Sequence, residues 1–418
     1  MSVDNNELLM LLGAKKSKQT IGIAGQQGFG VGVYGGDPAD LTAIGLTPME
    51  GCEDPSSANY GNYIHTNTSV MVYIPAFCYR IGNANAPSYA NDSANALEIR
   101  DASKGIGNGW VLHRAFINGG KRKLGFFIDK YLCSADHDIN IATSIADAHQ
   151  LMTCNGATAT TSTQSMPDCT GDTTDAITLC RARGQAYACA SAFQWSALSM
   201  LSLAHGQAAT STDYCAWYSS SNSFPKGCNN GKYGDVNDNT ISYGRHYDYM
   251  GKTGSGSPPQ KVTHNGQLCG VADVNGVSRQ ILLGAYGGST FGVAKESVSM
   301  HDFTKDNIKA PEMYDTGTGV YPYNGKWGNT NSISALFTEE TGIYRAACGV
   351  FPTLNGATGQ GMHLFGDDYA FCSMSSDSAL VTGGKSDEGA GTGIWCRHNA
   401  PWFNDSLLSS FRAAGYAN

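Results

Sequence analysis

Charged residues are scarce in this chain, and features that would mark several protein classes are missing. Only 15% of its 418 residues are charged, and the 27 Lys and Arg residues are outnumbered by 35 Asp and Glu residues. A nucleic-acid partner requires a basic surface, so the composition argues against one. No run of 18 apolar residues is present, which excludes a membrane span. The apolar stretch near the amino terminus is too short for a secretory signal, which predicts synthesis in a cytoplasm.

Patterns that mark metal sites and catalytic centres are also missing. The sequence has no C-x-x-C, no histidine pair at zinc-ligand spacing, no G-x-S-x-G and no H-E-x-x-H. No acid–base pair stands out either, so we expect a protein that is not an enzyme. The 13 cysteines leave two interpretations open: buried free thiols, or a few disulfides formed in an oxidising medium.

Glycine and small polar residues are abundant instead. The chain contains 52 glycines, and its 41% hydrophobic residues are enough to build a core. Low charge combined with much glycine favours a loop-rich protein containing β-strands. The length suggests two or more domains, and residues 83–109, rich in Asn, Ala, Ser and Gly, suggest a boundary.

Apolar runs broken by turn residues predict several strands. One pair is expected in 68–82, interrupted at Pro75, and another over 110–117 and 124–132 around the turn at 118–120. Further short strands are expected at Gln280–Leu283, at Gly342–Ala347 and near Phe411.

Three segments predict helices. They cover 4–12, 141–152 and 183–205, and Gly206 is expected to end the last one. Residues 20–36, where apolar residues alternate with glycine, predict tight strands or an extended arm.

Four short motifs follow one another in a recognisable order. They are Gly125-Phe126-Phe127-Ile128-Asp129-Lys130-Tyr131, Ala192-Phe193-Gln194-Trp195, Gly270-Val271-Ala272-Asp273-Val274-Asn275-Gly276 and Phe411-Arg412-Ala413-Ala414. This succession resembles the C-type lectin-like domain of the formylglycine-generating-enzyme group, and more closely the retroelement-diversified variable proteins. Upstream, residues 28–34, 59–63 and 71–75 resemble the start of phage tail-fibre and tropism-determinant proteins that carry such a domain.

The resemblance implies an α+β fold. It predicts a C-type lectin-like domain over 106–418 with a small antiparallel sheet, two helices and long loops, preceded by a β-rich attachment region over 1–105. The chain also departs from the family. The aromatic and acidic residues that follow Asn275-Gly276 in enzyme-like relatives are absent, and Cys372 and Cys396 lack the pattern of the oxidases.

Residues 395–405 are rich in side chains that make good contacts, because they combine large or rigid surfaces with hydrogen-bonding atoms. The resemblance places its contact face here, just before the last strand. The predicted ligand-binding residues are therefore Trp395, Arg397, His398, Asn399, Trp402, Phe403, Asn404 and Asp405. The alternative is that Trp395 and Trp402 are core residues and that Arg397 and Asn399 hold loops in place.

Two weaker motifs concern cofactors. Asp235, Asn237 and Asn239 alternate as in a calcium loop, which makes them candidate ligands for Ca²⁺. The glycine and the distal glutamate of that motif are absent, so a turn-rich loop is the competing interpretation. Gly251-Lys252-Thr253 matches only the end of a phosphate-binding loop, and no nucleotide site or other cofactor is expected.

Together these features predict a virion structural protein: a homotrimeric phage tail- or head-fibre subunit. Residues 1–105 would bind other virion proteins, and the C-terminal domain would bind a host-surface protein or glycan, with avidity from many copies. The alternatives are a capsid or collar decoration protein crosslinked through cysteines, and an oxidase of the formylglycine-generating group. Deleting residues 1–105 is expected to leave a folded C-terminal domain.

Overall fold

A computed structural model describes the structure of most residues of the chain. These are 19–134, 141–154, 158–160, 175–219, 240–247, 250–304, 307–318, 322, 325–327, 333, 348–352, 365, 368–371, 378–384, 392–401 and 409–417. The predicted helix over 4–12 and the predicted strand at Gly342–Ala347 lie outside them.

The first large sheet joins segments from both halves of the chain. Its six strands lie in the order β1-β2-β3-β9-β22-β12, and every pairing is antiparallel. Ile128 lies between Val72 on one side and Ala414 on the other. The strands are β1 (Leu46–Pro48), β2 (Asn62–His65), β3 (Val70–Pro75), β9 (Gly125–Asp129), β22 (Ala413–Gly415) and β12 (Tyr187–Cys189).

The second large sheet belongs to the C-terminal half. Its seven strands lie in the order β17-β16-β15-β20-β21-β19-β18, antiparallel except for the β19–β21 pair. The predicted strand at Gln280–Leu283 is confirmed as the first half of β15. The strands are β17 (Met313–Asp315), β16 (Phe291–Ala294), β15 (Gln280–Gly287), β20 (Ser378–Gly383), β21 (Gly393–Pro401), β19 (Tyr369–Phe371) and β18 (Gly325–Lys326).

Smaller elements complete the described part of the chain. The remaining strands are β4 (Phe77–Ile81), β5 (Leu97–Asp101), β6 (Val111–Leu112), β7 (Ile117–Asn118), β8 (Lys121–Arg122), β10 (Met152–Cys154), β11 (Thr158–Thr160), β13 (Arg245–Tyr247) and β14 (Met250–Gly251). The α-helices are α2 (Pro38–Ala43), α3 (Tyr89–Asp92), α4 (Ala176–Arg181) and α5 (Ala192–Ala208). Short 3-10 turns cover Ser93–Asn95, Ala102–Lys104, Arg114–Phe116, Pro259–Val262 and Met300–Asp302. The mixed α+β class is thus confirmed, although the sheets are larger than the small central sheet expected.

Helix α5 forms the centre of the molecule. Ser191 starts it with a capping box: its hydroxyl accepts from the Gln194 amide at 3.2 Å, and its own amide donates to the Gln194 side chain at 2.9 Å. Residues 192–206 are buried on every side, including the serines. A helix that is covered on every side belongs in the core of the protein.

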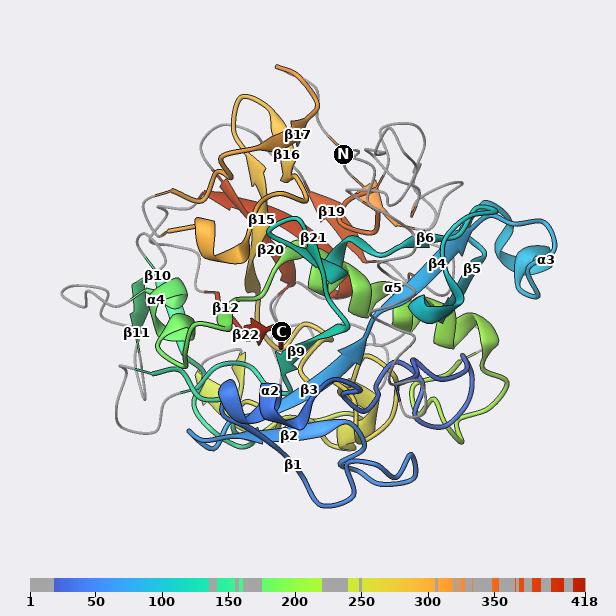
Figure 1. Cartoon of the computed structure of the whole chain (residues 1–418), viewed down its shortest axis with the longest axis horizontal. Coiled ribbons are helices and arrows are strands. Elements are labelled where there is room, and N and C mark those ends of the chain that lie inside the picture. The colour runs from blue at the N-terminus through green and yellow to red at the C-terminus, as the bar shows by residue number, and fades with distance from the viewer. Residues whose placement is uncertain are drawn as a thin grey trace.

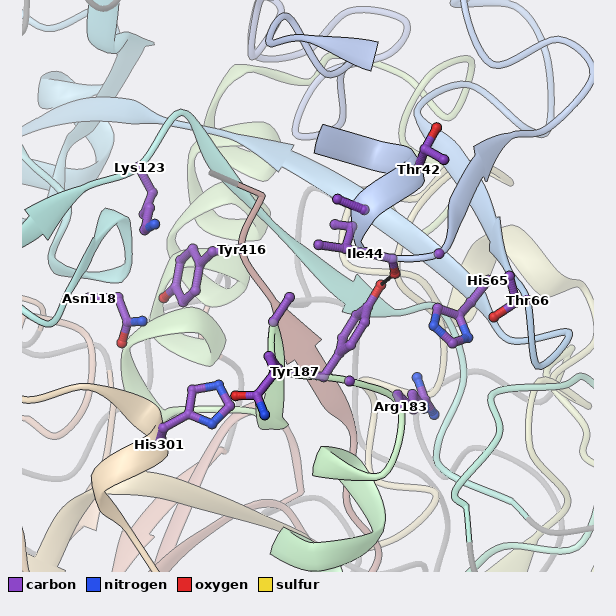
Figure 2. Close-up of a pocket in the computed structure, with 15 residues that line it drawn as sticks. Thr42, Ile44, His65, Thr66, Asn118, Lys123, Arg183, Tyr187, His301 and Tyr416 are labelled. Atoms are coloured by element: carbon purple, nitrogen blue, oxygen red, sulfur yellow. Dashed lines mark hydrogen bonds between the residues drawn. The ribbon is translucent and has the colours of Figure 1, made fainter. Parts of the chain in front are cut away.

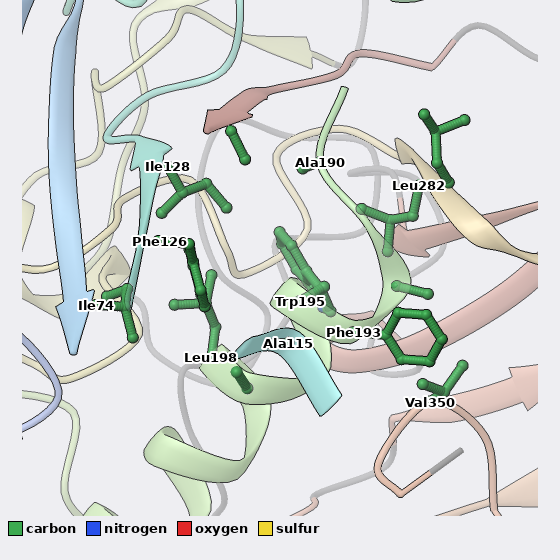
Figure 3. Close-up of a cluster of buried hydrophobic side chains, with 14 of the residues drawn as sticks. Ile74, Ala115, Phe126, Ile128, Ala190, Phe193, Trp195, Leu198, Leu282 and Val350 are labelled. Carbon is green, nitrogen blue, oxygen red and sulfur yellow. The ribbon is translucent and has the colours of Figure 1, made fainter. Parts of the chain in front are cut away.

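The core connects both sheets through this helix. In Figure 1, α5 crosses the middle of the molecule, between the seven-stranded sheet in the upper part of the view and strands β1 to β3 below. Figure 3 shows Ile74 and Phe126 of the first sheet on one side of Trp195, and Leu282 of the second sheet on the other. The two sheets therefore pack onto one hydrophobic core.

The predicted boundary between 105 and 106 runs through this shared structure. Strand β3 pairs with β9 from Met71 opposite Asp129 to Pro75 opposite Gly125. One cluster of buried residues contains both Ile21 and Phe411. Residues 19–105 are consequently built into the same body as the rest of the described chain.

Local predictions near the amino terminus are confirmed only in part. Strands β3 and β4 meet at Pro75 as expected, but they lie in different sheets. Strands β7 and β8 form a short hairpin around Gly119 and Gly120, which both have positive φ. The strands predicted over 110–117 and 124–132 do not pair with each other, because a 3-10 turn interrupts the first segment and β9 pairs with β3 and β22. Neither the tight strands nor the extended arm predicted for 20–36 forms, because this segment packs into the core. Turns cover residues 24–30, and Phe29 is buried against the core.

One helix prediction is wrong, and a second is confirmed except at its start. The segment 141–152 forms no helix: it contains a turn at 146–147, and Thr143 exchanges backbone hydrogen bonds with Ser134 at 2.7 and 2.8 Å. In 183–205 the first residues form β12, which pairs with β22, so the helix begins only at Ala192. The helix also continues past Gly206 to Ala208.

The nine described cysteines whose side chains are placed are all free and buried, namely Cys52, Cys78, Cys133, Cys180, Cys189, Cys215, Cys269, Cys348 and Cys396. For these nine, the interpretation as buried thiols is confirmed. Among the described residues, no helix combines the length and the apolar character needed to cross a bilayer.

Candidate functional site

The segment that the sequence predicts as a contact face begins on strand β21. This strand lies inside the second sheet, between β20 and β19. Its side chains alternate between the two faces of the sheet. The site is therefore built from two sets of residues, one facing the core and one facing away from it.

Trp395 belongs to the core set. Its side chain is 1% exposed, and its ring centroid lies 4.7 Å from that of Trp327 and 5.0 Å from that of Phe365. The buried carboxylate of Asp368 accepts a hydrogen bond from the Trp395 amide at 2.8 Å. Trp395 thus anchors β21 within an aromatic cluster.

Arg397 faces α5 and is also 1% exposed. Burial lowers its pKa to about 9, and its guanidinium lies 5.7 Å from the ring centroids of both Trp327 and Trp395. Its donors reach carbonyl and hydroxyl oxygens on several segments: Ile394 (2.7 Å), Thr382 (2.8 Å), Ser199 (2.9 Å), Val350 (3.0 Å), Cys396 (3.0 Å) and Gly349 (3.1 Å). Arg397 therefore ties β21 to α5 and to residues 349–350.

The prediction that Trp395, Arg397 and Asn399 make surface contacts is wrong for these reasons. Asn399 is 9% exposed and pairs with Leu380 of β20. The alternative interpretation, in which Trp395 is core and Arg397 fixes neighbouring segments, describes both residues correctly. Trp402, Phe403, Asn404 and Asp405 lie outside the described residues, as do Asp235, Asn237 and Asn239.

His398 belongs to the other set. It is partly exposed and lies opposite Phe371 of β19 in the parallel ladder, with the two ring centroids 6.0 Å apart. Partial burial, with Arg279 nearby, lowers its pKa to about 4, so the ring is neutral at pH 7.

Two aromatic residues that the sequence analysis does not name complete this face. Tyr369 is 37% exposed and Phe371 is 41% exposed, whereas Ala370 between them is fully buried. Residues two apart on a strand share a face, so Tyr369, Phe371 and His398 form one surface, here called the aromatic edge. Exposed aromatic rings next to a hydrogen-bonding group are well suited to stack on a sugar ring or an apolar side chain.

One signal for this surface is present in the sequence. The pattern Tyr369-Ala370-Phe371 places two aromatic rings on one face of any strand. Periodicity alone would assign that face to the core. The core instead receives Ala370 on this strand, because Arg397 and Trp395 of the neighbouring strand fill the space.

The other motifs do not form a reaction centre in the described residues. Thr253 of the Gly-Lys-Thr motif is buried, and its hydroxyl donates to the carbonyl oxygen of Ile145 at 2.5 Å. Within the described part of the chain, no group of three or more His, Cys, Asp or Glu residues is arranged to hold a metal ion. Arg412 and Phe411 of the last motif are buried.

Comparison with known proteins adds no assignment: no family model matches the chain, and a search of curated proteins finds no match.

Proposed function

We propose that this chain is a phage virion protein, a tail- or head-fibre subunit that binds a host-surface receptor through its C-terminal part. The proposal combines the resemblance to retroelement-diversified lectin-like proteins with the position of the aromatic edge. Tyr369, Phe371 and His398 lie beside the strand that leads into residues 402–405, the rest of the predicted contact segment. The observation that carries it is the exposure of Tyr369 and Phe371.

The chemistry of this edge supports binding. At pH 7 its histidine is neutral, and its aromatic rings offer apolar area with one phenol as a polar group. Its buried framework, with Arg397 held by six oxygen acceptors, keeps the strand rigid, which lowers the ordering cost of contact. A weak site of this kind gains avidity on a trimer or on a particle that carries many copies.

The partners follow from the same proposal. Residues 1–18 and exposed parts of the region up to 105 would bind other virion proteins, and the chain would associate as a homotrimer.

A decoration protein crosslinked through cysteines would need thiols other than the nine that are buried. An oxidase of the formylglycine-generating group would need a reactive thiol, and Cys396 is fully buried.

The test compares two variants of the purified full chain. Tyr369→Ala combined with Phe371→Ala removes the exposed rings, whereas Tyr214→Ala removes a ring that is 40% exposed elsewhere. We expect the double variant to lose at least tenfold in binding to cells of the bacterium on which the particle propagates, because exposed aromatic anchors dominate such contacts. The Tyr214 variant should bind like the wild type. Cell binding is measured by flow cytometry, and melting temperatures verify folding.

Two outcomes would count against the proposal. Equal binding by both variants would show that the aromatic edge is not the contact surface. If immunogold labelling finds the protein on no part of the particle, the virion role itself is wrong.

A further inference from the structure

A second surface feature, unrelated to the aromatic edge, is a cleft at the rim of the six-stranded sheet. Its volume is about 630 Å³, within the range of roughly 300 to 1,000 Å³ that small-molecule sites occupy. Its walls come from residues 42–45 after α2, residues 65–66 at the end of β2 and residues 183–187 between α4 and β12. Asn118, Lys123, His301 and Tyr416 close the remaining side.

The walls of this cleft are fixed by hydrogen bonds. The Tyr187 hydroxyl donates to the Ile44 carbonyl oxygen at 2.7 Å, and the Tyr416 hydroxyl donates to the Ala115 carbonyl oxygen at 2.8 Å. His65 packs edge-on against Tyr187, with ring centroids 5.2 Å apart. The cleft is therefore formed before any ligand arrives, which reduces the entropy that binding must overcome.

Three polar groups on the cleft wall remain available to a ligand. The Asn118 side chain accepts from the Met300 amide at 2.9 Å, which leaves its NH₂ group to donate elsewhere. Lys123 Nζ and the His301 ring make no hydrogen bond to another residue that the structure describes. Figure 2 shows Lys123, Asn118 and His301 grouped beside Tyr416, whereas the Tyr187 hydroxyl is directed toward Ile44.

The charge of the cleft is opposite to that of the chain. The protein carries a formal net charge of -8, yet none of the described lining residues is Asp or Glu. Arg183 in the wall is neutralised by Asp129, to which it donates at 2.5 and 2.9 Å. Lys123, which comes directly after the exposed Lys121 and the half-buried Arg122, supplies the positive charge that a ligand would meet.

We propose that this cleft binds a small hydroxylated ring compound carrying one anionic group, a sugar acid or a sugar phosphate. The Lys123 ammonium and the Asn118 amide contact the anion, and the half-buried Tyr416 packs against the ring. His301 adds a hydrogen bond to a ring hydroxyl. This site does not depend on the proposed receptor surface.

The experiment is isothermal titration calorimetry of the full chain with glucuronate, glucose 6-phosphate and neutral glucose. We expect both anions to bind saturably and more tightly than glucose. Lys123→Met, which keeps the apolar stem, should weaken both anions about ten- to a hundredfold, the range for a hydrogen bond to a charged group. Lys121→Met is the matched control, because it removes the same charge from an exposed neighbour outside the cleft wall; it should change affinity less than threefold.

The relative affinities of the two anions identify the class of ligand. A preference for glucuronate identifies a sugar acid, and a preference for glucose 6-phosphate identifies a sugar phosphate. The proposal is overturned if none of the three compounds binds, if glucose binds as tightly as the anions, or if the two lysine variants lose affinity equally. Unchanged melting temperatures of both variants exclude misfolding as the cause of a loss.

Discussion

At the scale of single residues, the composition of a segment does not tell whether its side chains face water. Trp395 and Arg397 have the chemistry of interface residues, and the same chemistry serves a buried framework. An arginine with five donors can be buried when carbonyl oxygens surround it. Arg397 meets this condition, because it contacts oxygens from α5, from residues 349–350 and from its own strand.

Replacing Arg397 with Met should therefore reduce stability. The substitution leaves several buried oxygens without a donor, and each costs on the order of 1 kcal/mol, so we expect a loss of at least about 3 kcal/mol. Arg100→Met is the control. Arg100 also stacks on a tryptophan, Trp110 at 4.2 Å, but it is half-buried, and its loss should cost about 1 kcal/mol. Urea unfolding measures both values. Loss of cell binding by Arg397→Met at wild-type stability would instead mean that Arg397 contacts the receptor.

For the aromatic edge the error runs the other way: residues whose sequence pattern predicts burial are partly exposed. Tyr369 and Phe371 lie in a short strand that reads as core, and the structure leaves both rings partly exposed. The sequence predicts that they share a face but not which face is solvent. That choice depends on β21, which is 27 positions further along the chain in the pairing of Ala370 with Arg397.

At the scale of elements, local signals in the sequence predict that a strand exists better than they predict which strand it pairs with. The strands around Pro75 and the hairpin of β7 and β8 follow from turn chemistry within a few residues. Strand β12 could not be predicted this way. Its residues also fit a helix, and β22, which is 228 positions away in the pairing of Tyr187 with Gly415, decides the outcome.

The pairing of β3 with β9 changes the expected result of deleting residues 1–105. The deletion removes β1 to β5 and exposes the edge of β9 together with Phe126 and Ile128 of the core. We now expect an insoluble or unfolded fragment, since an uncovered strand edge beside exposed apolar area promotes aggregation. Circular dichroism and size-exclusion chromatography of the fragment provide the test, with a deletion of residues 1–18 as the control that retains every described strand. A soluble, cooperatively melting 106–418 fragment would support a boundary after residue 105.

At the scale of the whole molecule, buried histidines make stability depend on pH. Burial lowers the pKa of His113 and His264 to about 3 and that of His205 and His398 to about 4. The unfolded chain then binds more protons than the folded chain below pH 6.5, so stability falls as the pH falls from about 6.5 to about 4. Asp92, whose pKa is raised to about 6 by burial, opposes this over part of the range.

We expect the free energy of unfolding in urea to be lower at pH 5 than at pH 7 by several kcal/mol, roughly 1 to 2 for each of these histidines. His113→Asn should reduce the difference by one histidine's share. Equal stability at the two pH values would mean that these rings are protonated, or accessible to water, in the folded protein.

The first sheet has a consequence for synthesis. Strand β22 fills the position between β9 and β12, and it consists of Ala413 to Gly415. A ribosome must therefore translate past residue 415 before the middle of that sheet can close. Nascent or prematurely terminated copies would keep this gap open to proteases, so only chains finished to that point would survive to assemble.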